Sequence, residues 1–315
     1  MRIGMVGLGR MGANMTKRLL EQGHDVVCYD RNPEAVADCE KDGATGATSL
    51  EHLVGQLDAP RAVWLMLPAG PATTTTIDSL NGLLRAGDTI VDGSNSPYRE
   101  ARHASEHLRE HGIHFLDCGV SGGVWGLKNG YCLMAGGDRD AVAALEPVFT
   151  ALAPADGYAH VGPSGAGHFV KMIHNGIEYG MLQAYAEGFA LMESAEELEL
   201  DLHQIAALWN HGSVVRSWLL ELTELALENP EEFSQVRGYI EDSGEGRWTV
   251  HEAIERAISA PVITAALYAR FSSRDDEKFA ARIVAALRNQ FGGHKFFTEA
   301  RAAERIAPSS DEEDR

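Results

Sequence analysis

The first half of the chain alternates between short apolar runs and segments with helical spacing. Each apolar run is bounded by glycine, proline or charged residues, which is typical of strands buried in a parallel sheet. We predict strands at residues 2–6, 25–30, 62–67, 88–92, 113–118, 131–135 and 158–161. Helices are predicted between them, at residues 14–22, 33–42, 71–84, 96–111 and 138–152. This alternation indicates an α/β fold with a Rossmann-like, doubly wound, mostly parallel sheet.

Beyond about residue 165 the strand pattern ends and helical spacing continues alone. Helices are predicted at residues 165–194, 202–209, 214–228, 250–258, 261–271 and 275–290, with a glycine-rich break at 242–248. We therefore expect a dinucleotide-binding domain at 1–164 and an all-α C-terminal domain at 165–300, for substrate binding and oligomerisation. The last residues, 301–315, are polar and charged, and we expect them to form a disordered acidic tail.

A glycine motif follows the first predicted strand directly. Gly7, Gly9 and Gly12 have G-x-G-x-x-G spacing, and the second strand ends at Asp30. In a dinucleotide-binding fold such glycines permit a tight turn, close approach of the backbone to a pyrophosphate and close helix–strand packing, and the acidic residue binds the ribose hydroxyls. The strand–turn–helix–strand context makes this a prediction of a NAD or NADP site. The predicted contacts are Gly7, Leu8, Gly9, Arg10, Met11, Gly12, Asp30, Arg31 and Asn32.

Three later loops follow predicted strands at the same edge of the sheet. They are residues 67–70, 92–96 and 120–123. Ligands of doubly wound sheets bind at the carboxyl ends of the strands, so a cofactor and its substrate are expected to meet at these loops. We predict further cofactor contacts from Leu67, Pro68, Ala69 and Asn95.

One predicted helix carries an unusual group of polar side chains. Lys171, Asn175 and Glu178 stand at i, i+4 and i+7, so they share one face, and His174 and Tyr179 flank it. An ordinary exposed face would explain one Lys–Glu pair. It does not explain the glycines spread along the same segment, which weaken a helix and indicate close packing against a ligand or another element. We predict that this face is a functional site.

The composition limits the possible partners. The formal net charge is −19, which argues against nucleic acid and anionic membranes. Only six of the 27 basic residues are lysine, and an acidic, lysine-poor surface is compatible with a high-salt cytoplasm. We find no C-x-x-C pair, signal-peptide pattern or apolar run long enough to span a membrane. A cytoplasmic protein without a metal site is expected.

Together these motifs resemble decarboxylating 6-phosphogluconate dehydrogenase, in the short form that carries one copy of the helical half. The resemblance runs from Ile3 to about His294, and its most specific segments are residues 92–99, 119–123 and 171–179. Residues 269–273 resemble the family's phosphate-binding arginine segment. Residues 288–294 resemble the terminal segment that reaches into the neighbouring subunit's site in the family.

The resemblance implies a role for each candidate residue. Lys171 would be the general base during oxidation of 6-phosphogluconate, and Glu178 would protonate the enediol that remains after carbon dioxide leaves, giving ribulose 5-phosphate. The carboxylate and hydroxyls of the substrate would be held by Asn95, Ser121, Gly122, Gly123, His174 and Asn175. Its phosphate would be held by Tyr179, Arg270, Arg288 and His294, the last two from a neighbouring subunit of a homo-oligomer that is at least a dimer.

Two segments depart from the long-form enzymes of this family. Residues 242–248 lack the lysine and threonine that help to bind phosphate there, and Arg247 is the candidate substitute. Asp30, Arg31 and Asn32 stand where NADP-dependent enzymes typically carry Asn-Arg-Thr. The Asp30 carboxylate would repel the 2′-phosphate of NADP, and a single exposed arginine should not outweigh that repulsion, because exposed ion pairs contribute only about 0–1 kcal/mol. We therefore predict NAD as the cofactor, with NADP less favoured.

Two other functions stay open. The chain could be another β-hydroxyacid dehydrogenase, of the 3-hydroxyisobutyrate or tartronate semialdehyde type, although these usually follow the lysine with two asparagines where this chain has His174 and Asn175. It could also be a catalytically silent dinucleotide-binding sensor. A sensor would not need the base and the acid that Lys171 and Glu178 supply together, so an enzyme is expected.

Overall fold

One eight-stranded sheet organises the N-terminal half of the protein. The computed structural model describes residues 1–275 and 278–292. The strands are β1 (Arg2–Val6), β2 (Asp25–Tyr29), β3 (Thr45–Gly46), β4 (Ala62–Leu65), β5 (Thr89–Asp92), β6 (His114–Ser121), β7 (Cys132–Gly136) and β8 (Tyr158–Gly162). Their order is β3-β2-β1-β4-β5-β6-β7-β8, and all neighbours are parallel except β6 and β7. The predicted α/β fold with a mostly parallel sheet is confirmed.

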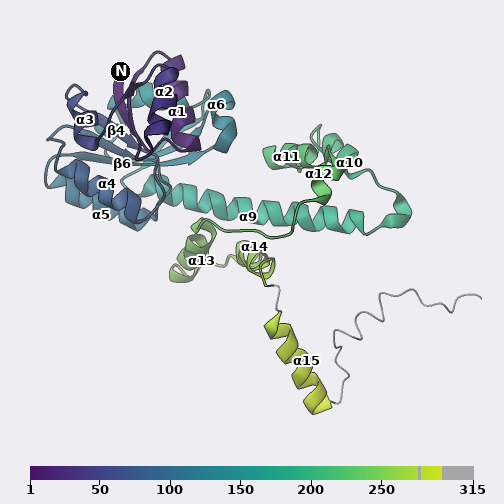
Figure 1. The fold of residues 1–315 in the computed structure, drawn as a ribbon. Helices are drawn as coiled ribbons and strands as arrows, with labels where there is room; N and C mark the ends of the chain where they lie inside the picture. Colours follow the sequence, from purple (N-terminus) through teal and green to yellow (C-terminus); the bar gives the residue numbers. More distant parts are fainter. Residues whose placement is uncertain (276–277, 293–315) are drawn as a thin grey trace, which may run out of the picture.

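Helices cover both faces of this sheet (Figure 1). They are α1 (Arg10–Glu21), α2 (Pro33–Lys41), α3 (Leu50–Gly55), α4 (Pro71–Asn81), α5 (Tyr98–Arg109), α6 (Gly126–Asn129), α7 (Arg139–Ala144) and α8 (Glu146–Leu152). One core joins the sheet to α1 and α8 and contains Met15 and Phe149. A second core joins it to α3, α4 and α5 and contains Leu53 and Leu108. Because both faces are buried, the strands are apolar without alternation.

The single helix predicted at residues 138–152 is wrong. The chain forms α7 and α8 instead, with Leu145 between them outside helical geometry. Pro147 lies in the first turn of α8, where its missing N–H costs nothing, whereas inside a continuous helix it would clash with the preceding turn. The short elements β3, α3 and α6 were not predicted, because runs of two to six residues carry too little periodicity.

The long helix α9 (Ala166–Glu193) leads from the sheet into the helical half (Figure 1). The buried carboxylate of Asp117 fixes its beginning, since it accepts hydrogen bonds from the amides of Gly165 at 2.6 Å and His168 at 2.8 Å. Gly167 packs so closely on the sheet that a Cβ there would lie 2.3 Å from the carbonyl oxygen of Asp117. Helix α9 is therefore anchored in the sheet at the turn that precedes Lys171.

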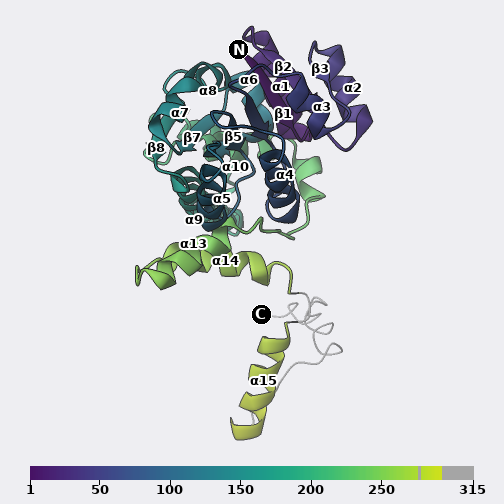
Figure 2. The same cartoon turned by 90° about the vertical axis from the view of Figure 1, so that its left-hand side faces the viewer.

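The remaining helices form two groups along α9, with α15 apart from both. They are α10 (Leu202–Trp209), α11 (Trp218–Leu227), α12 (Pro230–Ser234), α13 (Glu245–Glu255), α14 (Pro261–Ser272) and α15 (Phe279–Gly292). The first three gather at the far end of α9, and α13 and α14 return to the end nearest the sheet (Figures 1 and 2). Helix α15 points away from the others. The predicted all-α C-terminal part is confirmed, and no described helix combines the length and apolar character needed to cross a membrane.

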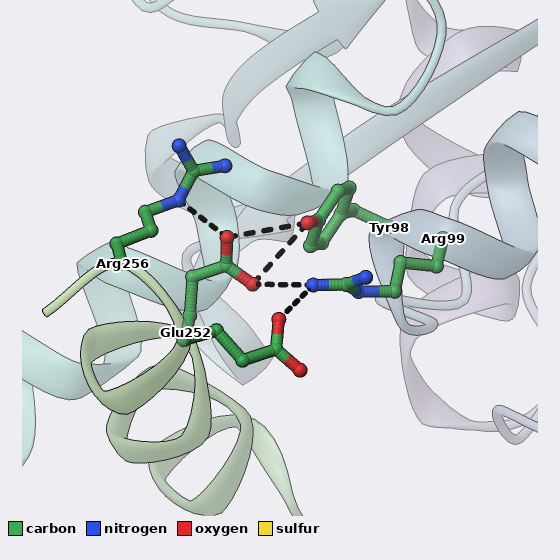
Figure 3. Close-up of polar contacts among 5 residues, drawn as sticks. Tyr98, Arg99, Glu252 and Arg256 are labelled. Atoms are coloured by element: carbon green, nitrogen blue, oxygen red, sulfur yellow. Dashed lines mark hydrogen bonds and ion pairs between the residues drawn. The ribbon is translucent and has the colours of Figure 1, made fainter.

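An ion-pair cluster ties α13 to α5 (Figure 3). The Glu252 carboxylate is buried and accepts hydrogen bonds from the Tyr98 hydroxyl at 3.2 Å and from Arg99 at 3.3 Å. Arg256 donates to the same carboxylate, and Arg99 also pairs with Glu255. Burial acts to raise the pKa of Glu252, but the hydrogen bonds from Arg256, Arg99 and Tyr98 together hold it below its usual range. The cluster thus fixes α13 to the sheet half. Helix α13 begins at Glu245, which lies near Lys171.

Candidate active site

The glycine turn between β1 and α1 has the shape that a dinucleotide requires. Gly7 has a φ of +91°, and a Cβ there would lie 2.4 Å from the carbonyl oxygen of Met66. A Cβ at Gly12 would lie 1.9 Å from the carbonyl oxygen of Gly7, so only glycine permits this packing. Gly9 has no such neighbour within 4 Å, and its open side leaves room for a phosphate above the first turn of α1. The residues present fit a dinucleotide.

A carboxylate closes this turn on the side of β2. Asp30 accepts hydrogen bonds from the Leu8 amide at 2.7 Å and from the Asn32 amide at 2.8 Å. The side chain of Asn32 caps α2 by accepting from the Glu34 amide. Arg31 is exposed, and no hydrogen bond or ion pair from its side chain to another described residue is seen. A ribose at the end of β2 would therefore meet a carboxylate fixed by two backbone amides, beside an exposed guanidinium.

Asn95 joins two of the predicted loops. It has a φ of +54°, a left-handed conformation that asparagine tolerates better than most residues. Its side chain accepts from the Val120 amide at 3.0 Å and donates to the Val120 carbonyl at 3.3 Å. This pair of hydrogen bonds holds the loop after β5 against the end of β6, where Ser121 begins the glycine loop. The loop after β4 lies beside the glycine turn, because the Leu67 side chain approaches Gly7.

The side chains of α9 form a hydrogen-bonded chain that ends on the loop after β6. Lys171 donates to the Asn175 Oδ1 at 2.8 Å, and His174 Nδ1 lies 2.9 Å from the same oxygen. An amide oxygen can only accept, so His174 carries a proton on Nδ1. Its Nε2 lies 3.4 Å from the Ser121 hydroxyl, and its Nδ1 lies 3.8 Å from Glu178. Four of the five residues predicted on this helix are thus brought together with Ser121, whereas Tyr179 is not part of this chain of contacts.

Burial sets the protonation of Lys171. Lys171 is only 6% exposed. Desolvation lowers the pKa of Lys171 below its ordinary value, because burial disfavours the ammonium, although the nearby carboxylates of Glu178 and Glu245 act in the opposite direction. A lysine with a lowered pKa loses its proton more readily than an exposed lysine, and its neutral amine can accept a proton from a ligand. The arrangement supports proton transfer between a ligand and Lys171.

One carboxylate near Lys171 was not predicted from the sequence. Glu245 is the first residue of α13, is 8% exposed and accepts a hydrogen bond from Ser243. Helix α13 packs on α9 without a gap, since the Thr249 hydroxyl donates to the Met172 carbonyl at 2.8 Å. Glu245 lies inside the glycine-rich segment 242–248, which was interpreted as a break although α13 begins there. An acidic residue between two glycines was the available signal.

The predicted phosphate-binding residues are only partly brought together. The Arg270 guanidinium lies over the Tyr179 ring at 3.5 Å and donates to the Glu241 carbonyl at 2.9 Å. Arg247, the candidate substitute, pairs through two hydrogen bonds with Asp242. Arg288 is exposed on α15, which points away from α9 in Figure 1. His294 and the tail at 301–315 lie outside the described residues.

Metal binding has no support in the part of the chain that the structure describes. There, no group of three or more His, Cys, Asp or Glu side chains is placed to hold an ion. His103, His107 and His111 repeat at a spacing of four along and just beyond α5, and the rings of His107 and His111 pack edge to face at 5.6 Å without forming such a group.

Two family models match the chain. The NAD binding domain of 6-phosphogluconate dehydrogenase matches residues 2–162, and the C-terminal domain of 6-phosphogluconate dehydrogenase matches residues 167–307. A NAD(P)-binding N-terminal half is therefore supported by both the match and the glycine turn.

Individual proteins agree with these matches. A Bacillus subtilis protein, YqeC, whose name proposes 6-phosphogluconate dehydrogenase as its function, is 44% identical over 93% of this chain and 98% of its own length. The NAD(+)-dependent, decarboxylating 6-phosphogluconate dehydrogenase of Haloferax volcanii is 43% identical over 94% of this chain and 98% of its own. Among solved structures, 6-phosphogluconate dehydrogenase of Plasmodium falciparum has a TM-score of 0.80 at 28% identity, over 95% of this chain and 66% of that one.

Proposed function

The chain belongs to the 6-phosphogluconate dehydrogenase family, and from that premise we propose that it oxidatively decarboxylates 6-phosphogluconate to ribulose 5-phosphate and carbon dioxide with reduction of NAD. The observation that carries the proposal is a pair of residues on one face of α9. Lys171 is buried and has a lowered pKa, and Glu178 supplies a carboxyl group two turns further along. A decarboxylating dehydrogenase needs both groups, because it removes one proton and returns another. The reaction rests on the family and on this pair.

Lys171 acts twice in the proposed reaction. Neutral Lys171 takes the proton from the third-carbon hydroxyl, and a nicotinamide cofactor held at the glycine turn would supply the acceptor for the hydride of the same carbon. The ammonium so formed lies beside the new carbonyl and stabilises the negative charge that develops on its oxygen as carbon dioxide leaves. Asn175 keeps the amine oriented through its 2.8 Å hydrogen bond. Proton transfer of this kind typically contributes about 10²–10⁴-fold to the rate.

Glu178 completes the reaction. Loss of carbon dioxide leaves an enediol, which becomes the ketose when its terminal carbon receives a proton. Glu178 is half-buried at 37% side-chain exposure, so it can donate that proton and recover one from water. Lys171 gives its proton to the carbonyl oxygen as the enediol forms and takes it back as the ketone forms, so transfer of this proton from Lys171 to Glu178 through solvent restores the starting state of both groups. His174, Ser121, Gly122 and Gly123 would bind the substrate's carboxylate and hydroxyls.

The proposed preference for NAD rests on the carboxylate that closes the glycine turn. Asp30 is held by two backbone amides, so it cannot swing away from a 2′-phosphate. The relative from Haloferax volcanii is named as NAD(+)-dependent, which supports the same choice. Arg31 is the opposing influence, and its effect is limited by its exposure.

We also propose a homo-oligomer whose subunits complete each other's phosphate sites. Several large apolar side chains of the helical half are exposed, among them Leu191 at 72%, Val214 at 100% and Ile254 at 70%. Apolar exposure of this extent marks an interaction surface. Tyr179 and Arg270 of one copy would then meet Arg288 and His294 of another, since α15, which carries Arg288, points away from α9 of its own copy.

A comparison of three substrates tests the reaction. With NAD present, 6-phosphogluconate should be oxidised at least 100-fold more efficiently, as kcat/KM, than unphosphorylated gluconate, because Arg270 and its partners would have no phosphate to bind. The third substrate, 3-hydroxyisobutyrate, addresses the related dehydrogenases, one of which from Mycobacterium tuberculosis has a TM-score of 0.70 at 26% identity. Equal efficiency with gluconate, or a preference for 3-hydroxyisobutyrate, would refute the assignment.

A further inference from the structure

A broad cavity lies on the side of α9 that faces away from Lys171. It is open to solvent, its volume is about 1020 Å³, and α5, the β8–α9 junction and the end of α13 border it. Helix α9 contributes Ala166, Phe169 and Val170. At about 100° per residue these three positions lie roughly opposite to the face that carries Lys171 and Asn175. The cavity is therefore separate from the site proposed for substrate.

Arginines from two helices converge on this cavity. Arg102 and Arg109 stand seven residues apart on one face of α5, and Arg139 begins α7. The stem of Arg102 packs against Gly165, whose added Cβ would lie 2.7 Å from the arginine Cγ. Among the described residues, none of the three guanidiniums has a hydrogen-bonding or ion-pair partner. Their donors are free to bind a ligand.

The charge of the cavity is opposite to that of the whole protein. Four arginines line it against two carboxylates, Glu106 and Asp138, although the charge of the fourth arginine, Arg256, is already paired with Glu252. Asp138 is already engaged as the cap of α7, where it accepts from two backbone amides. A local positive charge within a chain of net charge −19 attracts anions that the rest of the surface repels. Guanidiniums bind phosphate through paired hydrogen bonds, which favours phosphate over a simple halide.

The dimensions of the cavity indicate more than one phosphate. Seven residues of α5 correspond to a rise of about 10 Å between Arg102 and Arg109, and Arg139 approaches from another helix. The volume lies at the upper end of the range for small-molecule sites, which is about 300–1,000 Å³. A hydroxyl pair, Ser105 and Ser164 at 2.9 Å, adds polar groups to the wall. We propose that this cavity binds a small molecule that carries at least two phosphate groups.

Binding here would reach the contact between the two halves of the protein. Arg256 lines the cavity and also donates to Glu252 in the cluster of Figure 3. Tyr98, which lines the cavity too, donates to the same carboxylate. A polyphosphate competes with Glu252 for Arg256, so the ligand acts on the cluster that holds α13 against α5. A ligand at this site can thus regulate the position of α13, and with it the position of Glu245 relative to Lys171.

Calorimetric titration with tripolyphosphate tests the proposal on the full-length protein, in the presence of saturating NAD so that the glycine turn is occupied. We compare the Arg102→Ala/Arg109→Ala variant with an Arg2→Ala/Arg85→Ala control, which loses the same charge from exposed arginines outside the cavity. The proposal predicts binding that weakens at least tenfold in the cavity variant and less than twofold in the control. Inorganic phosphate should bind at least tenfold more weakly than tripolyphosphate.

Several results would overturn the proposal. They are no binding of tripolyphosphate up to millimolar concentration, equal weakening in both double variants, and binding that NAD abolishes. A cavity variant that changes the oligomeric state in analytical ultracentrifugation, without bound tripolyphosphate in the wild type, would identify the cavity as a subunit contact instead. The titration does not depend on catalysis, so failure of the proposed reaction and failure of this site are distinguishable.

Discussion

Replacing Asn175 by Asp tests the charge state of Lys171. The Lys171 Nζ donates to Asn175 Oδ1 at 2.8 Å, so the substitution places a carboxylate at about that distance. Two unit charges at this separation attract by about 1.5 kcal/mol in water and by about 6 kcal/mol at an effective dielectric constant of 20. One pKa unit corresponds to about 1.4 kcal/mol, so the pKa of Lys171 should rise by at least about one unit.

The consequence appears in the pH profile. Lys171 must be neutral to act as the base, and a raised pKa keeps it protonated to higher pH. The acidic limb of kcat/KM should therefore move upward by at least about one unit, with a loss of about tenfold or more below the limb and recovery above it. Asn175→Ser removes the amide without adding charge and should not move the limb upward. A limb that stays in place in Asn175→Asp would refute Lys171 as the base.

Three further changes have specific expected outcomes. Glu178→Gln should lower turnover about 10²–10⁴-fold through the final protonation while leaving cofactor binding intact, and near-normal turnover would exclude Glu178 as the acid. Asp30→Asn, with Arg31 retained, should shift the ratio of kcat/KM values toward NADP, and an unchanged ratio would show that Asp30 does not discriminate. Glu252→Gln should lower the free energy of unfolding in urea by about 1–3 kcal/mol at neutral pH, because charged hydrogen bonds are lost. Since the pKa of Glu252 is lowered, this difference should shrink as the pH falls through that pKa.

Local patterns were sufficient for the parts of the fold that short segments determine. The glycine turn could be predicted from the spacing of its glycines. This spacing is fixed because the structure has no room for a Cβ at Gly7 or Gly12. The shared face of Lys171, Asn175 and Glu178 followed from helical geometry alone. The break at Leu145 was not predicted, because the helical periodicity on both sides of it outweighed the signal that Pro147 offers.

Contacts between distant segments could not be predicted in the same way. Glu245 approaches Lys171 only because α13 packs against α9, and nothing in the local sequence of either helix specifies that pairing. Arg247 was a candidate for phosphate, yet Asp242 lies five residues before it and forms an ion pair with it. The arginine cavity likewise combines α5, α7 and α13, which are far apart in sequence. A role in a neighbouring subunit's site, as proposed for Arg288, depends on contacts that form only in the oligomer.

Release of carbon dioxide tests the proposed reaction most directly. The wild-type protein is mixed with NAD and 6-phosphogluconate labelled at its first carbon, and trapped label is compared with the NADH formed. The account predicts one labelled carbon dioxide for each NADH, and neither product from the Lys171→Met variant. Formation of NADH without labelled carbon dioxide, or unchanged release by Lys171→Met, would contradict it.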